Sequence, residues 1–471
     1  MPVGPVCRGP AITCPPTLVL VEMARIMKES NISGIVVVDH DTPIGIVTLR
    51  DLRDLIADTA NKINTLTVRD VMKTGLITIR TSDYLFKAIF LMSKHNIHRL
   101  VVVDEFDRLS GVITDTDLLR IQARSPLYLV QEIESATTIE QLRLIGSKMN
   151  DMLHYAVKTN ADAQSLIQLI AHFNDALTQR LIFILDFSHN VRLPSGAAFL
   201  TMGSEGREEQ TLRTDQDNAI VYRDDFTPEK LTEVLSFAIR IVSALESVGV
   251  PLCPGNMMAN NPDWCHSLSE WKQLTDRWIT IPGSNETVNF GVFQDLRVLH
   301  GEKSLEDELR THICECTHNN PIFFPNMARN IARFRPPIGM FNRLLVEKKG
   351  DHKGKLDLKK GGLFALTKGI SLIALEYGIV GGTTWSKLER LQHLHLVSDQ
   401  DMEVIQDAFS FLIKMRLEKQ LVAMSSGNEP DNFIDPLALT EREREQLRTA
   451  LRGVDTLINL LNSHYQLNLV A

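Results

Sequence analysis

The spacing of apolar and polar positions divides the chain into parts of different character. The first part repeats one order of elements twice: an amphipathic helix, a β-branched strand, a short strand and a second helix. A helical stripe of apolar residues follows, then strands mixed with helices, and finally helical periods alone. The pattern predicts an α/β multidomain chain with domains at 1–125, 126–190, 191–322 and 323–471.

The repeat is clearest in GIVTLRD (45–51) and GVITDTD (111–117), each at a predicted strand-to-helix turn. A threonine that caps a helix and an aspartate one turn later can accept the hydroxyls of a ribose, while the helix N-terminus favours phosphate. The alternative is a capping box without a ligand. Both segments resemble the CBS domain, whose paired units pack their sheets together and bind adenosine nucleotides. The resemblance implies a homodimer and a regulatory AMP or ATP at Thr48, Asp51, Thr114 and Asp117.

The second part contains SLIQLIAHFNDALTQRLIFILDF (165–187), in which apolar residues recur at helical spacing. We expect one long helix whose apolar face packs on a neighbouring element. Two roles remain open for this helical connector: a mechanical link between its neighbours, or packing alone.

The third part contains GSEGREEQTLRTDQDNAIVY (203–222). AAFLTM before it and AIVY at its end predict strands, and EGREEQTL between them predicts a short helix. Gly203 allows a backbone to approach a ligand closely, and Ser204 leads a helix whose free amides favour an anion. Asp215 and Asp217 stand two residues apart at a strand start, so both carboxylates project from one face, where they suit Mg²⁺ bound to substrate phosphates.

The run NFGVFQDLRVLHG (289–301) predicts a neighbouring strand that carries Asp295 as a third acid. Arg297 would share its face and could reach a carboxylate or a phosphate. The aspartate pattern is not an EF-hand loop, because no glycine follows at the sixth position, and no Walker loop is present. A lone D-x-D is more often a solvated strand end than a metal site. The hypothesis of a metal site therefore depends on the complete order of elements.

That order resembles the nucleotidyltransferase superfamily, in detail the module at the front of bacterial protein-PII uridylyltransferases, and a branch that couples this module to CBS pairs. The resemblance rests on GSEGREEQTLRTDQDNAIVY, CPGNMMANNPDW, FQDLRVLHG and LDLKKGG. It implies an α+β domain with a mixed sheet, NTP as substrate, and an acceptor hydroxyl on a protein, PII-like in kind. By the resemblance, the catalytic acids that bind Mg²⁺ are Asp215, Asp217 and Asp295. The residues that contact the nucleotide are Gly203, Ser204, Arg207 and Lys359.

The last part is helical in period, with short loops that predict an antiparallel bundle. FNRLLVEK (341–348) is included in this helical prediction. LDLKKGG (356–362) places Lys359 and Lys360 directly before a helix, where they compensate triphosphate charge or form a solvated charge pair.

Composition limits the partners. A formal net charge of −8 argues against general affinity for nucleic acid or an anionic membrane. Six scattered cysteines, and the lack of a signal peptide or membrane-spanning run, favour the cytoplasm.

Zinc at Cys253, Cys265 and His266, or at Cys314, Cys316 and His318, is disfavoured because paired C-x-x-C spacing is missing. Trp264, Trp271 and Trp278 favour a buried stripe over a base-stacking platform.

The sequence therefore predicts a Mg²⁺-dependent nucleotidyltransferase that CBS units regulate. Two alternatives stay open: a nucleotide sensor without catalysis, and a transferase that modifies a small molecule.

Overall fold

A computed structural model describes residues 3–7, 11–59, 63–95, 97–118, 126–158, 162–212, 215–281 and 283–467. The chain forms two compact units, residues 1–125 and 126–471. The repeat lies in the first unit, and one continuous core runs through the second unit. None of the described helices is long and apolar enough to cross a membrane.

The first unit contains two three-stranded sheets of the same topology. The strands are β1 (Thr13–Cys14), β2 (Gly34–Asp39) and β3 (Thr42–Thr48), then β4 (Thr78–Arg80), β5 (Arg99–Val103) and β6 (Leu109–Thr114). The helices are α1 (Leu20–Glu29), α2 (Leu49–Thr59), η1 (Ile63–Thr65), α3 (Val68–Val71) and α4 (Leu85–His95). In each sheet the middle strand pairs parallel with the first strand and antiparallel with the third.

The two sheets have the same register shift and pack against each other. The register of the antiparallel pair shifts after Val37 in one sheet and after Val102 in the other. Val36, Val101 and Val103 form a buried apolar cluster that joins the sheets. The repeat thus folds as a pair of like units packed sheet to sheet. Part of the helix predicted after Thr114 falls on residues 119–121, which lie outside the described residues.

The second unit is built on a four-stranded mixed sheet of order β10-β7-β8-β9. Its strands are β7 (Ala197–Thr201), β8 (Asn218–Tyr222), β9 (Cys265–Ser267) and β10 (Arg297–Gly301). β7 pairs antiparallel with β10 and with β8, and β8 pairs parallel with β9. The predicted strands AAFLTM and AIVY are therefore confirmed, as neighbours at the centre of the sheet.

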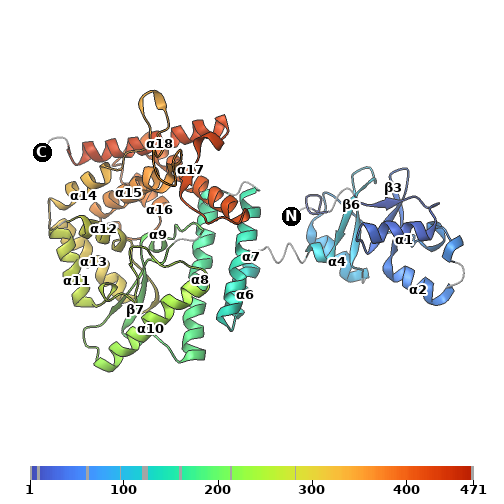
Figure 1. The fold of residues 1–471 in the computed structure, drawn as a ribbon, viewed down its shortest axis with the longest axis horizontal. Helices are drawn as coiled ribbons and strands as arrows, with labels where there is room; N and C mark the ends of the chain where they lie inside the picture. Colours follow the sequence, from blue (N-terminus) through green and yellow to red (C-terminus); the bar gives the residue numbers. More distant parts are fainter. Residues whose placement is uncertain are drawn as a thin grey trace. The chain divides into compact units, whose positions relative to one another are not determined.

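Helices surround this sheet, and the C-terminal ones lie together on one side of it (Figure 1). The first group comprises α6 (Pro126–Ser135), α7 (Ile139–Lys158), α8 (Ala163–His189), α9 (Gly203–Gly206), α10 (Pro228–Ser247), η2 (Pro262–Trp264), α11 (Leu268–Thr280), α12 (Ser284–Phe293) and α13 (Ser304–His318). The C-terminal group comprises α14 (Phe323–Ala332), η3 (Met340–Asn342), η4 (Lys359–Leu363), α15 (Phe364–Glu376), α16 (Thr384–His393), α17 (Asp399–Ser425), η5 (Pro436–Ala438) and α18 (Glu441–His464), with the strand pair β11 (Leu356–Asp357) and β12 (Phe433–Ile434).

The long helix of the predicted connector is confirmed as α8. Asp162 caps its start by accepting from the backbone N–H of Ser165, and Asn190 ends it in the left-handed conformation. Its apolar face belongs to the core of the second unit. The connector is therefore an integral part of the unit that contains the sheet.

Three local predictions were wrong. EGREEQTL is helical only to Gly206, because Glu208 adopts a φ of +57 that a helix cannot contain. NFGVF lies in α12 rather than in a strand, since Phe290 and Phe293 occupy one fully buried helix face. FNRLLVEK is not a helix beyond η3, where Phe341 also has a positive φ.

The tryptophans at seven-residue spacing are buried, as predicted. Trp271 contacts Trp264 and Trp278 with ring centroids 5.9 and 6.2 Å away, and Phe293 stacks on it at 4.4 Å. Aromatic packing between α11 and α12 fixes the turn that precedes β10.

Candidate active site

A glycine turn joins β7 to the segment that carries the paired aspartates. Gly203 has a φ of +56, the left-handed region that glycine adopts without strain. A Cβ atom at Gly203 would stand 3.0 Å from Oδ2 of Asp217. The N–H of Met202 donates to the carbonyl oxygen of Asp217 at 2.9 Å, and Ser204 follows as the second residue of α9. The missing side chain at Gly203 therefore lets the turn approach the Asp217 carboxylate.

The two aspartates lie in an extended segment directly before β8. Gln216, between them, is fully buried and donates to the carbonyl oxygens of Val242 at 3.2 Å and Val250 at 3.1 Å. Because successive residues of an extended chain point to opposite sides, Asp215 and Asp217 share the face away from that core. The fold thus brings both carboxylates to the side of the Gly203 turn.

Burial and neighbouring charges act in opposite directions on the pKa of Asp217. Burial raises the pKa of Asp217 and the charge of Asp215 raises it further, while a hydrogen bond with Cys253 and the charge of Lys359 oppose the rise. Burial and Arg416 lower the pKa of Lys359, and the two aspartates raise it. A bound divalent cation would relieve the repulsion between the carboxylates. Two adjacent carboxylates with a few protein cations are a donor set that fits Mg²⁺.

The lysine of this group lies in an unusual turn. Lys359 begins η4, a π-helical turn that leads into α15, and such turns often occur at functional sites. Asp357 accepts from the N–H of Lys360 at 3.0 Å just before the turn. The charge of Lys359 interacts with the charges of Asp215 and Asp217.

Arg416 is a candidate that the sequence analysis missed. It lies on α17 with 7% of its surface exposed, and its Nε donates to Oδ1 of Asn432 at 2.7 Å. The pKa of Arg416 is lowered to about 10, because burial outweighs the opposing charges of Asp357 and Asp215. A buried arginine is uncommon. The signal in the sequence is a cation on the apolar face of the helical segment KMRLEKQL (414–421).

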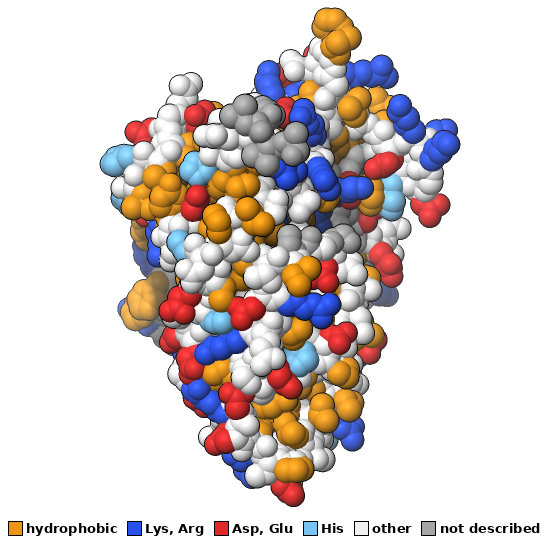
Figure 2. Space-filling view, turned by 90° about the vertical axis from the view of Figure 1, so that its left-hand side faces the viewer, with side chains coloured by type: hydrophobic (Ala, Val, Ile, Leu, Met, Phe, Trp, Pro, Cys, Tyr) orange, Lys and Arg blue, Asp and Glu red, His pale blue; other side chains and the backbone are white. Residues whose placement is uncertain are grey.

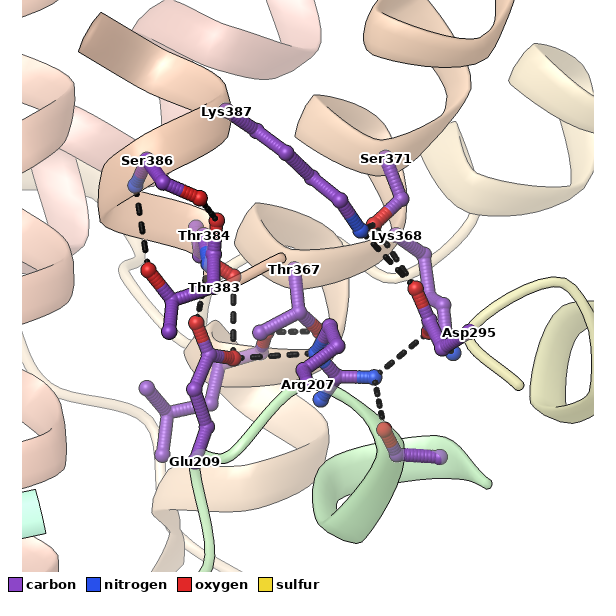
Figure 3. Close-up of polar contacts among 12 residues, drawn as sticks. Arg207, Glu209, Asp295, Thr367, Lys368, Ser371, Thr383, Thr384, Ser386 and Lys387 are labelled. Atoms are coloured by element: carbon purple, nitrogen blue, oxygen red, sulfur yellow. Dashed lines mark hydrogen bonds and ion pairs between the residues drawn. The ribbon is translucent and has the colours of Figure 1, made fainter. Parts of the chain in front are cut away.

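Asp295 lies at the centre of a separate group of charges (Figure 3). Its side chain is 1% exposed and pairs with Arg207 at 2.7 Å, Lys368 at 3.0 Å and Lys387 at 2.9 Å. Burial raises the pKa of Asp295, but these three cations outweigh burial and hold the pKa well below its usual range. Protein cations already engage both carboxylate oxygens, so the geometry does not favour the predicted role of third Mg²⁺ ligand.

Arg207, a predicted nucleotide contact, is engaged by groups of the protein itself. It is 6% exposed and donates to the carbonyl of Gly203 at 3.0 Å, to Asp295 at 2.7 Å and to Glu209 at 2.9 Å. Glu209 in turn accepts from the N–H and the hydroxyl of Thr384 at the start of α16 (Figure 3). Arg207 therefore ties the glycine turn to the C-terminal helices.

Two further side chains complete the surroundings of the aspartate pair. Arg297 binds Asp175 of α8 through both carboxylate oxygens, at 2.9 and 2.8 Å, so its partner is a carboxylate. Burial, Asp175 and Asp217 raise the pKa of Glu205 to about 8, and Arg297 opposes this rise. A carboxyl with this pKa is largely protonated at neutral pH and can donate a hydrogen bond. From the sequence, Glu205 was predicted only as part of the short helix EGREEQTL.

A cavity of about 840 Å³ adjoins the site. Val292 lines it and lies 3.6 Å from the Cβ position of Gly203, and Lys368 both lines it and pairs with Asp295. Cations in the lining outnumber anions; they are Arg333, Arg335, Lys355, Lys360 and Lys368, against Glu347 and Asp357. Lys and Arg side chains also gather in the upper part of the face in Figure 2. A site of this size suits a small anionic molecule.

The first unit holds the predicted regulatory residues in two equivalent turns. The Thr48 hydroxyl donates to Asp51 at 2.5 Å, and the Thr114 hydroxyl donates to Asp117 at 2.5 Å. The backbone N–H of each threonine donates to the same aspartate oxygen, at 2.8 and 3.0 Å. Both turns are therefore capping boxes, whether or not they also bind a ligand.

A cavity of about 380 Å³ lies beside the first of these turns. Its lining combines Thr48 and Asp51 with the cationic or ionisable side chains of Lys73, His98 and Arg99. Lys73 pairs with Asp51 at 2.7 Å. Burial raises the pKa of Asp51, but hydrogen bonds from Lys73 and Thr48 outweigh burial and lower it.

The fold and these sites define a class of protein: paired α/β repeats joined to a mixed sheet in which a glycine turn faces two aspartates. Family models agree with this description. "CBS domain" matches residues 3–58 and 68–124, "Putative nucleotidyltransferase DUF294" matches 147–285, and "Putative nucleotidyltransferase substrate binding domain" matches 321–465. The chain therefore combines a pair of CBS domains with the two domains of the family described as "Putative nucleotidyltransferase DUF294".

Curated relatives match over shorter stretches. The uncharacterized protein MJ1232 of Methanocaldococcus jannaschii is 37% identical over 23% of this chain and 35% of its own length. The uncharacterized protein MK0525 of Methanopyrus kandleri is 36% identical over 28% of this chain and 66% of its own length. The chain therefore spans less than two thirds of either relative. Among solved structures, the CBS domain pair of protein MJ0100 with 5'-methylthioadenosine and S-adenosyl-L-methionine is 28% identical, covers 26% of this chain and 99% of that one, and has a TM-score of 0.24.

Proposed function

We propose that this protein is a Mg²⁺-dependent nucleotidyltransferase that moves a nucleoside monophosphate from NTP to an acceptor hydroxyl. The observation that supports this most is the approach of the Gly203 turn to the Asp217 carboxylate, with Asp215 on the same face and Lys359 opposite. A triphosphate needs such a combination of open backbone, metal ligands and cations.

Each side chain has a distinct part in the proposed reaction. Asp215 and Asp217 would hold Mg²⁺, which when bound supplies charge neutralisation on the phosphates. Lys359 and Arg416 would bind phosphate oxygens beside the aspartates, and the backbone at Gly203 and Ser204 would hold the triphosphate chain. The acceptor oxygen forms a bond to the α-phosphorus, the bond to the bridging oxygen breaks, and pyrophosphate leaves while the hydroxyl proton passes to solvent.

Asp295 and Arg207 act through other residues in this proposal. Asp295 fixes the ammonium groups of Lys368 and Lys387, and Arg207 fixes the Gly203 turn. Both are positioning residues rather than catalytic ones. The cationic cavity lined by Lys360 and Lys368 would receive the part of the NTP that extends beyond the aspartate pair.

The acceptor and the regulation are further parts of the proposal. By the resemblance to protein-PII uridylyltransferases, the acceptor is a hydroxyl on a protein, PII-like in kind. AMP or ATP would bind the first unit through Thr48, Asp51, Thr114 and Asp117, and the chain would work as a homodimer. The mixture of a ribose-binding turn with Lys73 and Arg99 in one cavity supports an adenosine phosphate as the ligand.

Purified protein incubated with Mg²⁺, cell extract and each labelled NTP tests the proposal. Wild type and the control D225N, an exposed aspartate beyond the other end of β8, should label a macromolecule, whereas D215N and D217N should not. Equal labelling by D217N and wild type would contradict the proposal. Dialysable label would favour a small-molecule acceptor, and AMP binding without any labelling would favour a sensor without catalysis.

A further inference from the structure

Three potential metal ligands meet on the outer side of the second unit. Asp276 lies on α11, and His312 and Cys316 lie one turn apart on α13. Oδ1 of Asp276 is 2.9 Å from Nε2 of His312 and 2.8 Å from Sγ of Cys316, and Sγ is 3.5 Å from Nε2. Within the described part of the chain, these three form the group whose ligand atoms lie close enough together to share an ion.

The arrangement is not that of a catalytic cysteine. A nucleophile relay places the thiol and the carboxylate at opposite ring nitrogens of the histidine. Here Asp276 and the carbonyl oxygen of Lys272, at 3.2 Å, both face Nε2 of His312, while Sγ of Cys316 lies over the ring, 3.5 Å from Nε2 and 3.9 Å from Nδ1. Burial and the adjacent Asp276 raise the pKa of the Cys316 thiol to about 12, the reverse of activation.

The separations of the ligand atoms are close to those of tetrahedral coordination, and the ring of His312 would turn to aim Nε2 at the ion. Zinc bonds of about 2.0 Å to oxygen and nitrogen and about 2.3 Å to sulfur place ligand atoms about 3.3 to 3.6 Å apart. The separation of Sγ from Nε2, 3.5 Å, already falls in this range. The two separations that involve Asp276 are shorter, because hydrogen bonds hold those atoms, and Asp276 is about half exposed and free to withdraw slightly.

We infer that Asp276, His312 and Cys316 bind a zinc-class divalent cation with water as the fourth ligand. Thiolate and carboxylate together balance the two charges of the ion, so the complex is neutral and suits a half-buried position. Binding forms the metal–sulfur bond and releases the Cys316 proton to solvent. A depression of about 280 Å³ lined by Lys272, Thr311 and His312 gives access. The ion would fasten α11 to α13.

This group of ligands differs from the one that the cysteine and histidine spacing along the sequence had suggested. Cys314 and His318, which the spacing associates with Cys316, do not join it: His318 faces the carbonyl oxygens of Cys314 at 2.7 Å and Glu376 at 2.8 Å. They are therefore matched controls on the same helix. Cys314 is a partly exposed thiol two residues from Cys316.

Cobalt titration of the full chain tests the inference. With excess Mg²⁺ present to occupy the aspartate pair, one equivalent of Co²⁺ should produce the thiolate charge-transfer and visible bands of tetrahedral cobalt, and Zn²⁺ should abolish them. C316A and H312A should lose the bands, whereas C314A and D215N should keep them. Bands that persist in C316A, or that appear only at large metal excess, would overturn the inference.

A second measurement needs no variant and covers the case in which C316A fails to fold. One equivalent of Zn²⁺ should slow alkylation of Cys316 by at least ~10-fold while leaving Cys314 unchanged, as measured by peptide mass spectrometry. Equal alkylation rates of Cys316 with and without Zn²⁺ would contradict metal binding.

Discussion

Two acidic centres in the second unit differ in how their charge is compensated. Asp295 is 1% exposed and three cations surround it, so its pKa lies far below the usual range. The pKa of Asp217 lies above the usual range, because burial and Asp215 outweigh Cys253 and Lys359. Three cations contact the carboxylate of Asp295, whereas Asp217 keeps a raised pKa despite the charges of Lys359 and Lys368, so a bound divalent cation would favour its charged form.

The difference separates a structural role from a binding role for the same residue type. A buried carboxylate with its own cations contributes to the folded state and has no free oxygen for a metal. A pair of half-compensated carboxylates destabilises the folded state until a ligand binds. The predictions below test this contrast, from the largest expected effect to the smallest.

Replacement of Asp295 by Asn should destabilise the second unit by about 3 to 5 kcal/mol, because Arg207, Lys368 and Lys387 lose their shared carboxylate. Urea unfolding followed by tryptophan fluorescence measures this, since all four tryptophans lie in the second unit. D217N is the matched control and should not be destabilised. Equal losses in the two variants would remove the contrast between the centres.

Saturating Mg²⁺ should stabilise the wild-type second unit, by ~2.7 kcal/mol at a hundredfold excess over its dissociation constant. D217N should lose this stabilisation and D225N should keep it. The measurement is the shift of the fluorescence-detected unfolding midpoint on adding Mg²⁺. An unchanged shift in D217N would show that the ion binds elsewhere.

Glu205 should make the second unit less stable as the pH rises. Its pKa is about 8 in the folded protein against an ordinary value of 4.5, so its contribution is complete below about 4.5 and disappears as the pH approaches about 8. Between these values the slope reaches at most about 1.4 kcal/mol per pH unit. E205Q should flatten the profile in that interval. Asp295 has the opposite sign, with stability lost only as the pH falls below its ordinary value of 3.8.

Replacement of Gly203 by Ala should cost ~1 kcal/mol, because the new Cβ atom meets Oδ2 of Asp217 and the φ of +56 disfavours a side chain. It should also weaken the Mg²⁺-dependent stabilisation. Gly378, with a φ of +68 and open space around its Cβ position, is the control for backbone strain alone. If G378A changed the response to Mg²⁺ as much as G203A, contact with Asp217 would not be the cause.

Much of the fold follows from local pattern. The paired repeat, the long helix α8 and the two central strands were all predicted, because hydrophobic periodicity directly records which face of an element is buried. Predictions failed where a tertiary contact overrode propensity. Phe290 and Phe293 turned an apparent strand into α12, and the positive φ of Glu208 ended a helix that its neighbours favour.

The sequence by itself determined that Asp215 and Asp217 share a face and that a glycine precedes them, because both follow from spacing within a short segment. Only the tertiary structure decided that Asp295 belongs to Arg207, Lys368 and Lys387. Those cations come from three other elements, α15, α16 and the segment after α9. The charge state and availability of a carboxylate depend on neighbours brought together by folding, and periodicity along one segment carries no information about them.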